Sequence, residues 1–288
     1  MTFAVSLPLQ LHHPRTGEMP SLHPTLSHVR AVVFDLGGTL YEGDAPVPGV
    51  PEAVRTLRDG GVPVRFLTNT TSQSRRALVE KLRAMDLPAR AEHLHGPPAA
   101  AGDFLRKRNA SAHVLVPEGA REDFDGVTQV SEGGDGAPDY VVVGDLGDAW
   151  TFDRLNGAFR MIQEGGAGLI GLGRARYWQG PGGALRLDAG PFVAALEQAT
   201  GREALVLGKP APRFFEAALA GLDVPAAQVA LVGDDAETDV RAAMRAGLTG
   251  VLVRTGKFRD GDERGSDEDP APDAVLDSAA DVVTRDAT

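Results

Sequence analysis

Residues 32–40 read VVFDLGGTL, and this stretch decides the fold of the chain. An apolar run ends in the carboxylate of Asp35, and Gly37 and Gly38 follow within three residues. The run predicts a buried strand, and the glycines predict a tight turn directly after it. Open α/β sheets bind their ligands at the carboxyl ends of the strands, so we expect Asp35 to lie where the chemistry takes place.

Outward from this motif, apolar runs alternate with amphipathic stretches along most of the chain. We predict strands at 31–34, 64–67, 113–116, 140–144, 168–171, 204–207, 229–232, 250–253 and 274–276. Helices are predicted at 51–60, 74–85, 152–163, 191–200, 212–220, 239–246 and 278–283. This alternation is typical of parallel sheets with right-handed crossovers, so the predicted class is α/β with a doubly wound, Rossmann-like core.

Two segments rich in glycine and proline, at 96–98 and 180–183, flank the second run of strands and helices. We interpret that run as an inserted α/β cap domain at 96–187. The core domain is then built from 29–95 and 188–288. The first 28 residues show little periodicity and are expected to form a disordered extension, in which Met19 offers an alternative start of the chain.

Composition narrows the choice of partners. The 288 residues carry a formal net charge of −11, which disfavours binding to nucleic acid or to an anionic membrane surface. The chain has no cysteine, so disulfides and thiolate sites are excluded. It has neither an apolar run long enough to span a membrane nor a convincing signal peptide, and we expect a cytoplasmic protein.

Polar residues follow four of the predicted strands. They are Asp35, the pair Thr68 and Asn69, Lys209 in the triplet GKP, and Asp234, Asp235 and Asp239 in GDDAETD. Each group alone has an ordinary interpretation as a turn, a helix N-cap or a solvated loop. Together on one rim of one sheet, they predict phosphoryl transfer through an aspartyl-phosphate.

In this hypothesis Asp35 is the nucleophile. A carboxylate and a phosphate repel each other, so a cation has to lie between them. Asp35, Asp234 and the backbone carbonyl of Gly37 offer hard oxygen ligands of the kind that Mg²⁺ prefers. The expected cofactor is therefore Mg²⁺, with a focused lysine charge in place of a broad basic patch.

The remaining polar residues are expected to serve the phosphate and the lysine. Thr68 and Asn69 can donate hydrogen bonds to phosphoryl oxygens, and Lys209 can neutralise the charge of Asp35 and the phosphate. Asp239 is better placed to hold Lys209 or a metal-bound water than to be a primary ligand. Asp235 is assigned a supporting role beside it.

The motifs DLGGTLY, FLTNTTSQS, LGKP, VGDDAETD and VRTGKF, in this order, resemble the haloacid dehalogenase (HAD) superfamily and its NagD-type capped subfamily. The resemblance covers about residues 29–288. It is greatest to the phospholysine phosphohistidine inorganic pyrophosphate phosphatase subgroup, through the elements TNTT, ARY, GPFVAALE, GDD and RTGKF. It implies a Mg²⁺-dependent phosphatase for a small phosphorylated substrate, with a homodimer among the assemblies that capped relatives form.

The chain departs from the usual HAD phosphatase motif DxDGT, because Gly37 occupies the position of the second aspartate. The resembling subgroup usually has another small residue, serine, there. That aspartate acts as general acid–base, a role worth on the order of 10²–10⁴-fold in rate. Gly37 therefore favours substrates with P–N, pyrophosphate or aryl phosphate bonds, or it leaves activity low. A nearly inactive phosphoryl-binding regulator and transfer to an acceptor other than water stay open as alternatives.

A basic and aromatic cluster in the predicted cap has two interpretations. It is a loop that faces the substrate, or it is an ordinary strand with one packed aromatic face. Two aspartates of a nearby cap loop are further candidates to face the site. The cluster is Arg174, Arg176, Tyr177 and Trp178, and the aspartates are Asp145 and Asp148.

Overall fold

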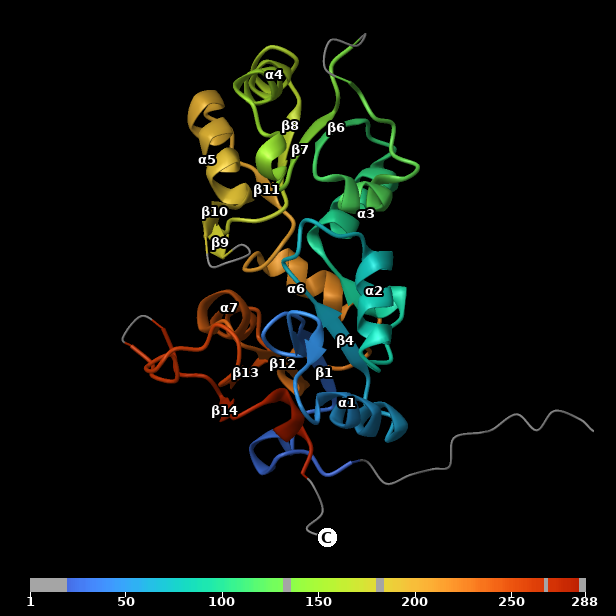
Figure 1. Cartoon of the computed structure of the whole chain (residues 1–288), viewed down its shortest axis with the longest axis vertical. Coiled ribbons are helices and arrows are strands. Elements are labelled where there is room, and N and C mark those ends of the chain that lie inside the picture. The colour runs from blue at the N-terminus through green and yellow to red at the C-terminus, as the bar shows by residue number, and fades with distance from the viewer. Residues whose placement is uncertain (1–19, 132–135, 180–183, 267–268, 285–288) are drawn as a thin grey trace, which may run out of the picture.

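A computed structural model describes residues 20–131, 136–179, 184–266 and 269–284. These residues form two α/β lobes that lie one above the other along the long axis of the molecule (Figure 1). The lobe with a six-stranded sheet is called the core lobe below, and the lobe with a four-stranded sheet is called the cap lobe.

The core sheet has the strand order β14-β13-β12-β1-β4-β5, and every neighbouring pair is parallel. Its strands are β1 (Ala31–Asp35), β4 (Val64–Leu67), β5 (Leu94–His95), β12 (Val229–Gly233), β13 (Thr249–Val253) and β14 (Ala274–Leu276). The order reverses at β1, which is the switch point where ligands bind in such sheets. The predicted doubly wound α/β class is confirmed.

Helices cover both faces of the core sheet. One face packs against α1 (Val50–Asp59), α2 (Arg75–Ala84) and the short 3₁₀ helix η8 (Ala279–Val282), and the other against α6 (Pro212–Leu219) and α7 (Ala242–Arg245). Strand β1 serves both faces, since Val32 and Phe34 belong to the first apolar cluster and Val33 to the second. This period of two is what a fully buried strand requires.

The cap lobe repeats the plan with the strand order β11-β8-β7-β6, again all parallel. Its strands are β6 (Ala112–Leu115), β7 (Tyr140–Val143), β8 (Gly168–Gly171) and β11 (Leu205–Val206). Helix α3 (Pro97–Arg108) and the 3₁₀ helix η3 (Glu118–Phe124) cover one face, and α4 (Phe152–Gln163) and α5 (Ala189–Thr200) cover the other. Two antiparallel hairpins complete the chain: β2 (Tyr41–Glu42) with β3 (Ala45–Pro46), and β9 (Tyr177–Gln179) with β10 (Leu185–Leu187).

The structure moves one predicted domain boundary. We expected the chain to return to the core at residue 188, but α5 and β11 belong to the cap lobe. Strand β11 pairs with β8, and Val193 and Leu196 of α5 pack with the cap strands. The apolar pattern of residues 204–207 predicts a strand but does not tell which sheet it joins, because that depends on a non-local pairing.

The predicted disorder of residues 1–28 is wrong for residues 20–28. A 3₁₀ turn, η1 (Pro24–Leu26), buries Leu26 in the core-lobe cluster. The backbone N–H of His23 donates to the carbonyl of Val282 at 2.9 Å, so this segment is tied to η8. The expectation for residues 1–19 lies outside the described residues.

The segment at 96–98, which we used as a flank of the predicted cap domain, leads into a helix. Pro97 and Pro98 occupy the first positions of α3, where a missing N–H has no cost because no intrahelical acceptor exists for it. The second flanking segment, 180–183, lies outside the described residues. Within the part of the chain that the structure describes, no helix has the length and apolar character needed to cross a bilayer.

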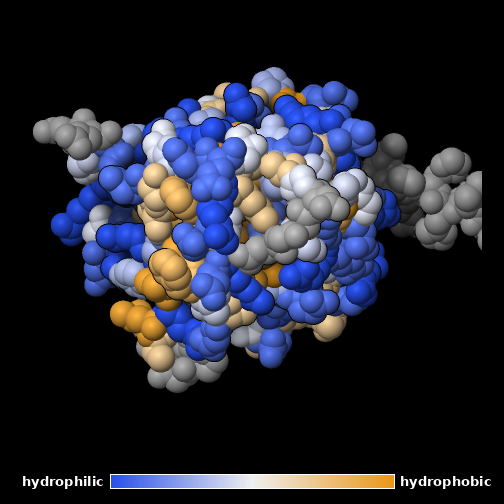
Figure 2. Space-filling view, turned by 90° about the horizontal axis from the view of Figure 1, so that it is seen from above, coloured by the Kyte–Doolittle hydropathy of each residue, from blue (hydrophilic) through white to orange (hydrophobic). Residues whose placement is uncertain are grey.

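The cap end of the molecule is mainly hydrophilic, with a few apolar patches (Figure 2). Among the described residues, the large apolar side chains that are exposed belong to the cap lobe. They are Phe152, Tyr177, Trp178, Leu185 and Leu187. Four of these five lie on the β9–β10 hairpin.

Candidate active site

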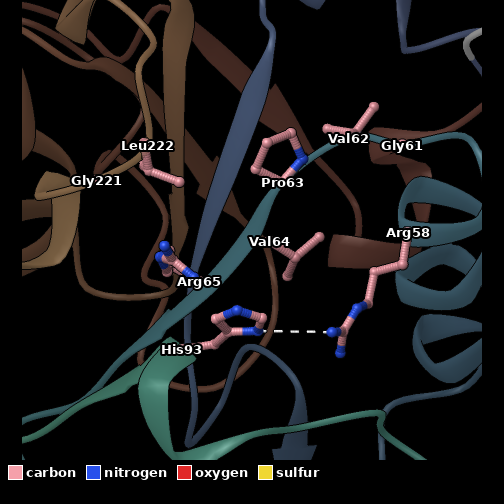
Figure 3. A pocket seen from close by; sticks show the side chains of 9 residues that line it. All are labelled: Arg58, Gly61, Val62, Pro63, Val64, Arg65, His93, Gly221 and Leu222. Carbon is pink, nitrogen blue, oxygen red and sulfur yellow. Dashed lines mark hydrogen bonds between the residues drawn. The ribbon is translucent and has the colours of Figure 1, made fainter.

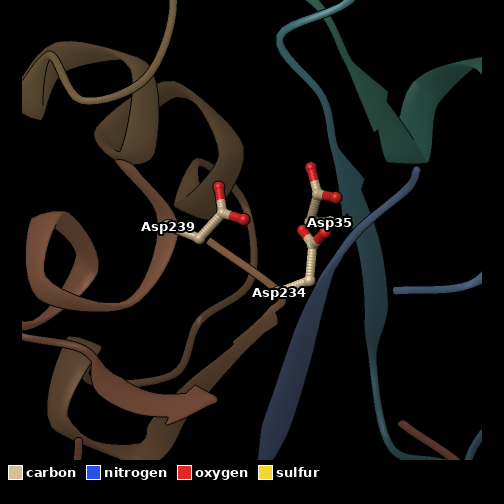
Figure 4. Close-up of side chains that lie close together, drawn as sticks. All are labelled: Asp35, Asp234 and Asp239. Carbon is tan, nitrogen blue, oxygen red and sulfur yellow. The ribbon is translucent and has the colours of Figure 1, made fainter. Parts of the chain in front are cut away.

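Three carboxylates meet at the carboxyl edge of the core sheet (Figure 4). Asp35 is the last residue of β1, and Asp234 directly follows β12, its neighbour in the sheet. Asp239 lies on η7 (Ala236–Arg241), a short π-helical segment after β12. One oxygen from each carboxylate lies within 4.8 Å of the others, and all three residues are buried.

Lys209 joins two of these carboxylates. Its Nζ lies 2.5 Å from Asp35 Oδ1 and 2.5 Å from Asp239 Oδ1, and the side chain is 3% exposed. Lys209 does not follow a core strand, as we had expected, since β11 belongs to the cap sheet. It reaches the site from the segment that crosses between the two lobes.

Burial and charge oppose each other in this cluster. Burial alone would lower the pKa of Lys209, but Asp239 and Asp35 outweigh it and raise that pKa, so the ammonium stays protonated. Burial raises the pKa of Asp35 against the opposing effect of Lys209. It also raises the pKa of Asp234 and of Asp239 to about 6. Three buried carboxylates share one buried lysine, and a further cation would relieve this surplus of negative charge.

The carboxylates also offer a free ligand atom. Asp234 Oδ1 is buried and has no hydrogen-bond partner among the described residues, although buried polar oxygens are nearly always paired. Its other oxygen, Oδ2, accepts a hydrogen bond of 2.7 Å from the backbone N–H of Lys257. An oriented carboxylate with one open oxygen, beside a second carboxylate, fits a hard divalent cation such as Mg²⁺.

Two glycines let the backbone approach Asp234. Gly38 and Gly256 have φ angles of +84° and +60°, which glycine adopts without steric cost. A Cβ atom on either would lie 2.0 Å or 2.1 Å from Asp234 Oδ2. Gly37 differs, because a Cβ placed there would have no atom within 4 Å. The glycine at the usual acid–base position therefore leaves open space beside Asp35.

Asn69 and Thr68 follow β4, the other neighbour of β1. The Asn69 side chain donates to the backbone carbonyl of Lys209 at 3.0 Å and accepts from its N–H at 2.7 Å. The Thr68 hydroxyl lies 3.0 Å from that of Thr70 and accepts from the N–H of Thr70. Asn69 thus anchors the lysine backbone, a task that we had not assigned to it.

Asp235 has a local structural task. Its side chain accepts hydrogen bonds from the backbone N–H groups of Glu237 and Thr238, so it caps the helical segment that carries Asp239. Next to it, Gly233 leaves room for Asp239, since a Cβ on Gly233 would lie 2.6 Å from the Asp239 side chain. The GDD sequence thereby fixes the orientation of Asp239 towards Lys209.

The sequence analysis missed Lys257 and Thr255, which follow β13 in the same parallel sheet. Thr255 donates from its hydroxyl to the carbonyl of Gly38 at 2.5 Å and ties this loop to the DLGGTL turn. Lys257 supplies the N–H that holds Asp234 and brings its Nζ to 3.4 Å from Asp235. Polar residues after the end of a predicted strand were the signal for the other site residues, and TGK follows the predicted strand 250–253 in the same way.

The basic and aromatic cluster of the cap is largely engaged in contacts within the cap. Arg174 forms a two-pronged salt bridge with Glu197 of α5. Trp178 donates from its indole N–H to Asp145 at 3.1 Å, and Asp148 pairs with Arg186 of the hairpin. Arg176 and Tyr177 are exposed neighbours with a guanidinium-to-ring distance of 6.0 Å. The charges of Arg174 and Asp148 are therefore each paired within the cap, Arg174 with Glu197 and Asp148 with Arg186.

Two hydrolase family models match this chain. The family model described as haloacid dehalogenase-like hydrolase matches residues 32–128, and the HAD-hydrolase-like model matches residues 206–282. Haloacid dehalogenase-like hydrolase domain-containing protein 2 of Rattus norvegicus is 40% identical over 235 residues, which are 82% of this chain and 88% of the relative. The chain belongs to the HAD hydrolase family. Phospholysine phosphohistidine inorganic pyrophosphate phosphatase of the same species is 37% identical over 263 residues, 90% of this chain and 94% of that protein.

Solved structures of this HAD family share the two-lobed fold. The 4-nitrophenylphosphatase of Thermotoga maritima has a TM-score of 0.79 and 27% identity, and the match covers 90% of this chain and 98% of that one. NagD of Escherichia coli K-12 has a TM-score of 0.77 and 26% identity, with 88% and 98% covered. The expected resemblance to NagD-type capped HAD hydrolases is confirmed, and the protein is an enzyme of the HAD phosphatase type.

Proposed function

We propose that this HAD protein is a Mg²⁺-dependent phosphohydrolase that works through an aspartyl-phosphate at Asp35, on a small phosphorylated substrate. One observation carries the proposal. In the buried cluster, Lys209 bridges Asp35 and Asp239 beside the unpaired oxygen of Asp234. Asp35, Asp234 and the backbone carbonyl of Gly37 would hold the cation. When bound, Mg²⁺ offsets the charge of the phosphate and makes phosphorus a better electrophile.

The reaction then consists of two displacements at phosphorus, the first by Asp35 and the second by water. An Asp35 carboxylate oxygen attacks, the bond from phosphorus to the leaving atom breaks, and the leaving group departs with the bonding electrons and takes up a solvent proton. Water next attacks the phosphorus of the acyl phosphate, the bond from phosphorus to the Asp35 oxygen breaks, and a proton of the water passes to solvent. This step frees inorganic phosphate and restores the Asp35 carboxylate. Lys209 stays protonated throughout and holds Asp35 and Asp239 in place.

The open space at Gly37 sets the expected substrate preference. No side chain at this position can protonate an alkoxide, so alkyl phosphate esters should react slowly. Phosphoramidates, pyrophosphate and aryl phosphates release groups that need less protonation. The names of the relatives support this choice, since they mention phospholysine, phosphohistidine, inorganic pyrophosphate and 4-nitrophenyl phosphate chemistry.

A substrate panel tests the proposal. Phosphoramidate, pyrophosphate, 4-nitrophenyl phosphate and a sugar phosphate are each incubated with the protein, with and without Mg²⁺, and released phosphate is measured. We expect Mg²⁺-dependent turnover of the first three to exceed that of the sugar phosphate. Absence of Mg²⁺-dependent phosphate release from all four substrates would reject the enzyme interpretation.

The same glycine favours a second candidate, a phosphoryl-binding regulator with little turnover. Its open space leaves Asp35 without a neighbouring acid–base from residue 37. Beryllium fluoride separates the two candidates when it is combined with the panel. Trapping at Asp35 together with turnover supports the enzyme, and trapping without turnover supports the regulator.

A further inference from the structure

A cavity of about 280 Å³ opens at the opposite edge of the core sheet from Asp35. Its walls come from the end of α1, the start of β4, the 3₁₀ helix η2 (Ala91–His93) and the turn after α6. Figure 3 shows the side chains of Arg58 and Arg65 on either side of the His93 ring.

A second cavity of about 640 Å³ adjoins the first and shares Arg58 with it. It is lined by Arg55, Arg58, Asp59, Arg83, Pro88, Ala89 and Arg90. The two cavities together present five arginines, one histidine and a single carboxylate. This concentration of positive charge stands out in a chain with a formal net charge of −11.

Three of these arginines, Arg58, Arg65 and Arg83, form no ion pair with a described carboxylate, and Arg83 Nε donates to the carbonyl of Ala89 at 2.9 Å. Arg65 Nε is buried without a hydrogen-bond partner, and the side chain forms no ion pair with any described residue. The side chain of Arg58 reaches His93 Nδ1 at 3.5 Å, and across the described ranges no carboxylate lies within salt-bridge distance of it. Arg55 and Arg90, by contrast, form exposed pairs with Glu52, Asp86 and Glu92. A buried guanidinium N–H without an acceptor, such as that of Arg65 Nε, is costly, and an anion would satisfy it.

The charges around the cavity also favour a bound anion. Burial and the nearby charges of Arg90 and Arg65 lower the pKa of Arg58, against the opposing charges of Glu92 and Asp59. The pKa of His93 is lowered by burial and by Arg65 and Arg58, with Glu92 opposing them. Cationic groups that depress one another form a site at which a negative ligand is stabilising.

We propose that this pocket is a second anion site, which binds a small phosphorylated molecule remote from Asp35. One phosphate lies between Arg58, Arg65 and His93, where planar guanidinium groups can each form paired hydrogen bonds to its oxygens. The neighbouring cavity receives a second anionic group of the ligand beside Arg83 and Arg90. The combined size suits a ligand larger than inorganic phosphate.

Isothermal titration calorimetry of the metal-free protein with inorganic pyrophosphate tests this site. Without metal, the three carboxylates around Lys209 repel an anion, so binding reports on the arginine pocket. We expect one site per chain, and Arg65→Gln or Arg58→Gln should weaken it by at least about tenfold. Inorganic phosphate, which fills only the first cavity, should bind more weakly than pyrophosphate.

Controls separate this site from the catalytic one. Arg108→Gln removes an exposed arginine of the cap and should leave pyrophosphate affinity unchanged. An NMR titration of His93 should show its pKa rising when pyrophosphate is bound, because the anion offsets Arg58, Arg65 and Arg90 and outweighs Glu92. Unchanged affinity in both pocket variants, or loss of binding in Lys209→Met instead, would overturn the proposal. Phosphatase turnover of Arg65→Gln reports separately on the proposed function, which does not depend on this pocket.

Discussion

Replacing Gly37 by aspartate tests whether the missing acid–base determines substrate preference. The structure favours the substitution sterically, because a Cβ at Gly37 meets no atom within 4 Å and the φ angle lies outside the left-handed region. The new carboxyl group would stand two residues after Asp35, at the open side of the site. We therefore expect Gly37→Asp to fold with a thermal stability close to that of the parent protein.

The expected magnitude follows from the role of a positioned general acid. Such a group contributes on the order of 10²–10⁴-fold, which corresponds to about 2.7–5.5 kcal/mol of barrier. Gly37→Asp should raise kcat/KM for an alkyl phosphate towards this range. The gain for 4-nitrophenyl phosphate should be much smaller, since its leaving group departs without a proton.

The assay measures phosphate release from both esters at saturating Mg²⁺ for the parent and the variant. The matched control is Gly38→Ala, whose Cβ would lie 2.0 Å from Asp234 Oδ2 and should abolish activity on both esters. An unchanged ratio of alkyl to aryl turnover in a folded Gly37→Asp variant would refute the reasoning about the missing acid–base.

Three other outcomes follow from the site. Lys209→Met should lower the free energy of unfolding by about 3–5 kcal/mol in urea titrations, because it leaves buried carboxylates without their partner. Lys257→Met, with its side chain 70% exposed, should lower it by less than about 1 kcal/mol. Equal losses of unfolding free energy in the two variants would contradict the buried bridge. Gly256→Ala should abolish turnover by displacing Asp234. Gly261→Ala, at a φ of +104°, also strains the backbone, but its added Cβ meets nothing within 4 Å, so it controls for strain without the clash and should retain turnover. Asn69→Ala should lower kcat at least about tenfold by releasing the Lys209 backbone, and an unchanged kcat would count against that role.

The convergence of Asp35 and Asp234 was predictable because parallel strands bring their carboxyl ends to one edge. The apolar runs before both residues have the composition of fully buried strands, and the structure places them on neighbouring strands. Local sequence was sufficient here, since each residue needs only its own strand and the rule for the sheet edge.

The origin of Lys209 could not be predicted in this way. Residues 204–207 show the same apolar pattern in either sheet, and their pairing with β8 rests on a contact between segments more than thirty residues apart. Helix α3 was missed because Pro97 and Pro98 were interpreted as marking a domain boundary and not as a helix start. Lys257 was missed because no carboxylate stands beside it after the predicted strand. Its contact with Asp234 is made by the backbone N–H, which every residue except proline has, so the residue type does not predict it.

The central claim is that Asp35 becomes phosphorylated during turnover. A single-turnover reaction with ³²P-labelled pyrophosphate and Mg²⁺, quenched with acid within milliseconds, captures such an acyl phosphate for peptide mapping. We predict transient label on the peptide that contains Asp35, and no label on the Asp35→Asn variant. Full phosphate release from the parent protein with no label on that peptide at any quench time would contradict the account.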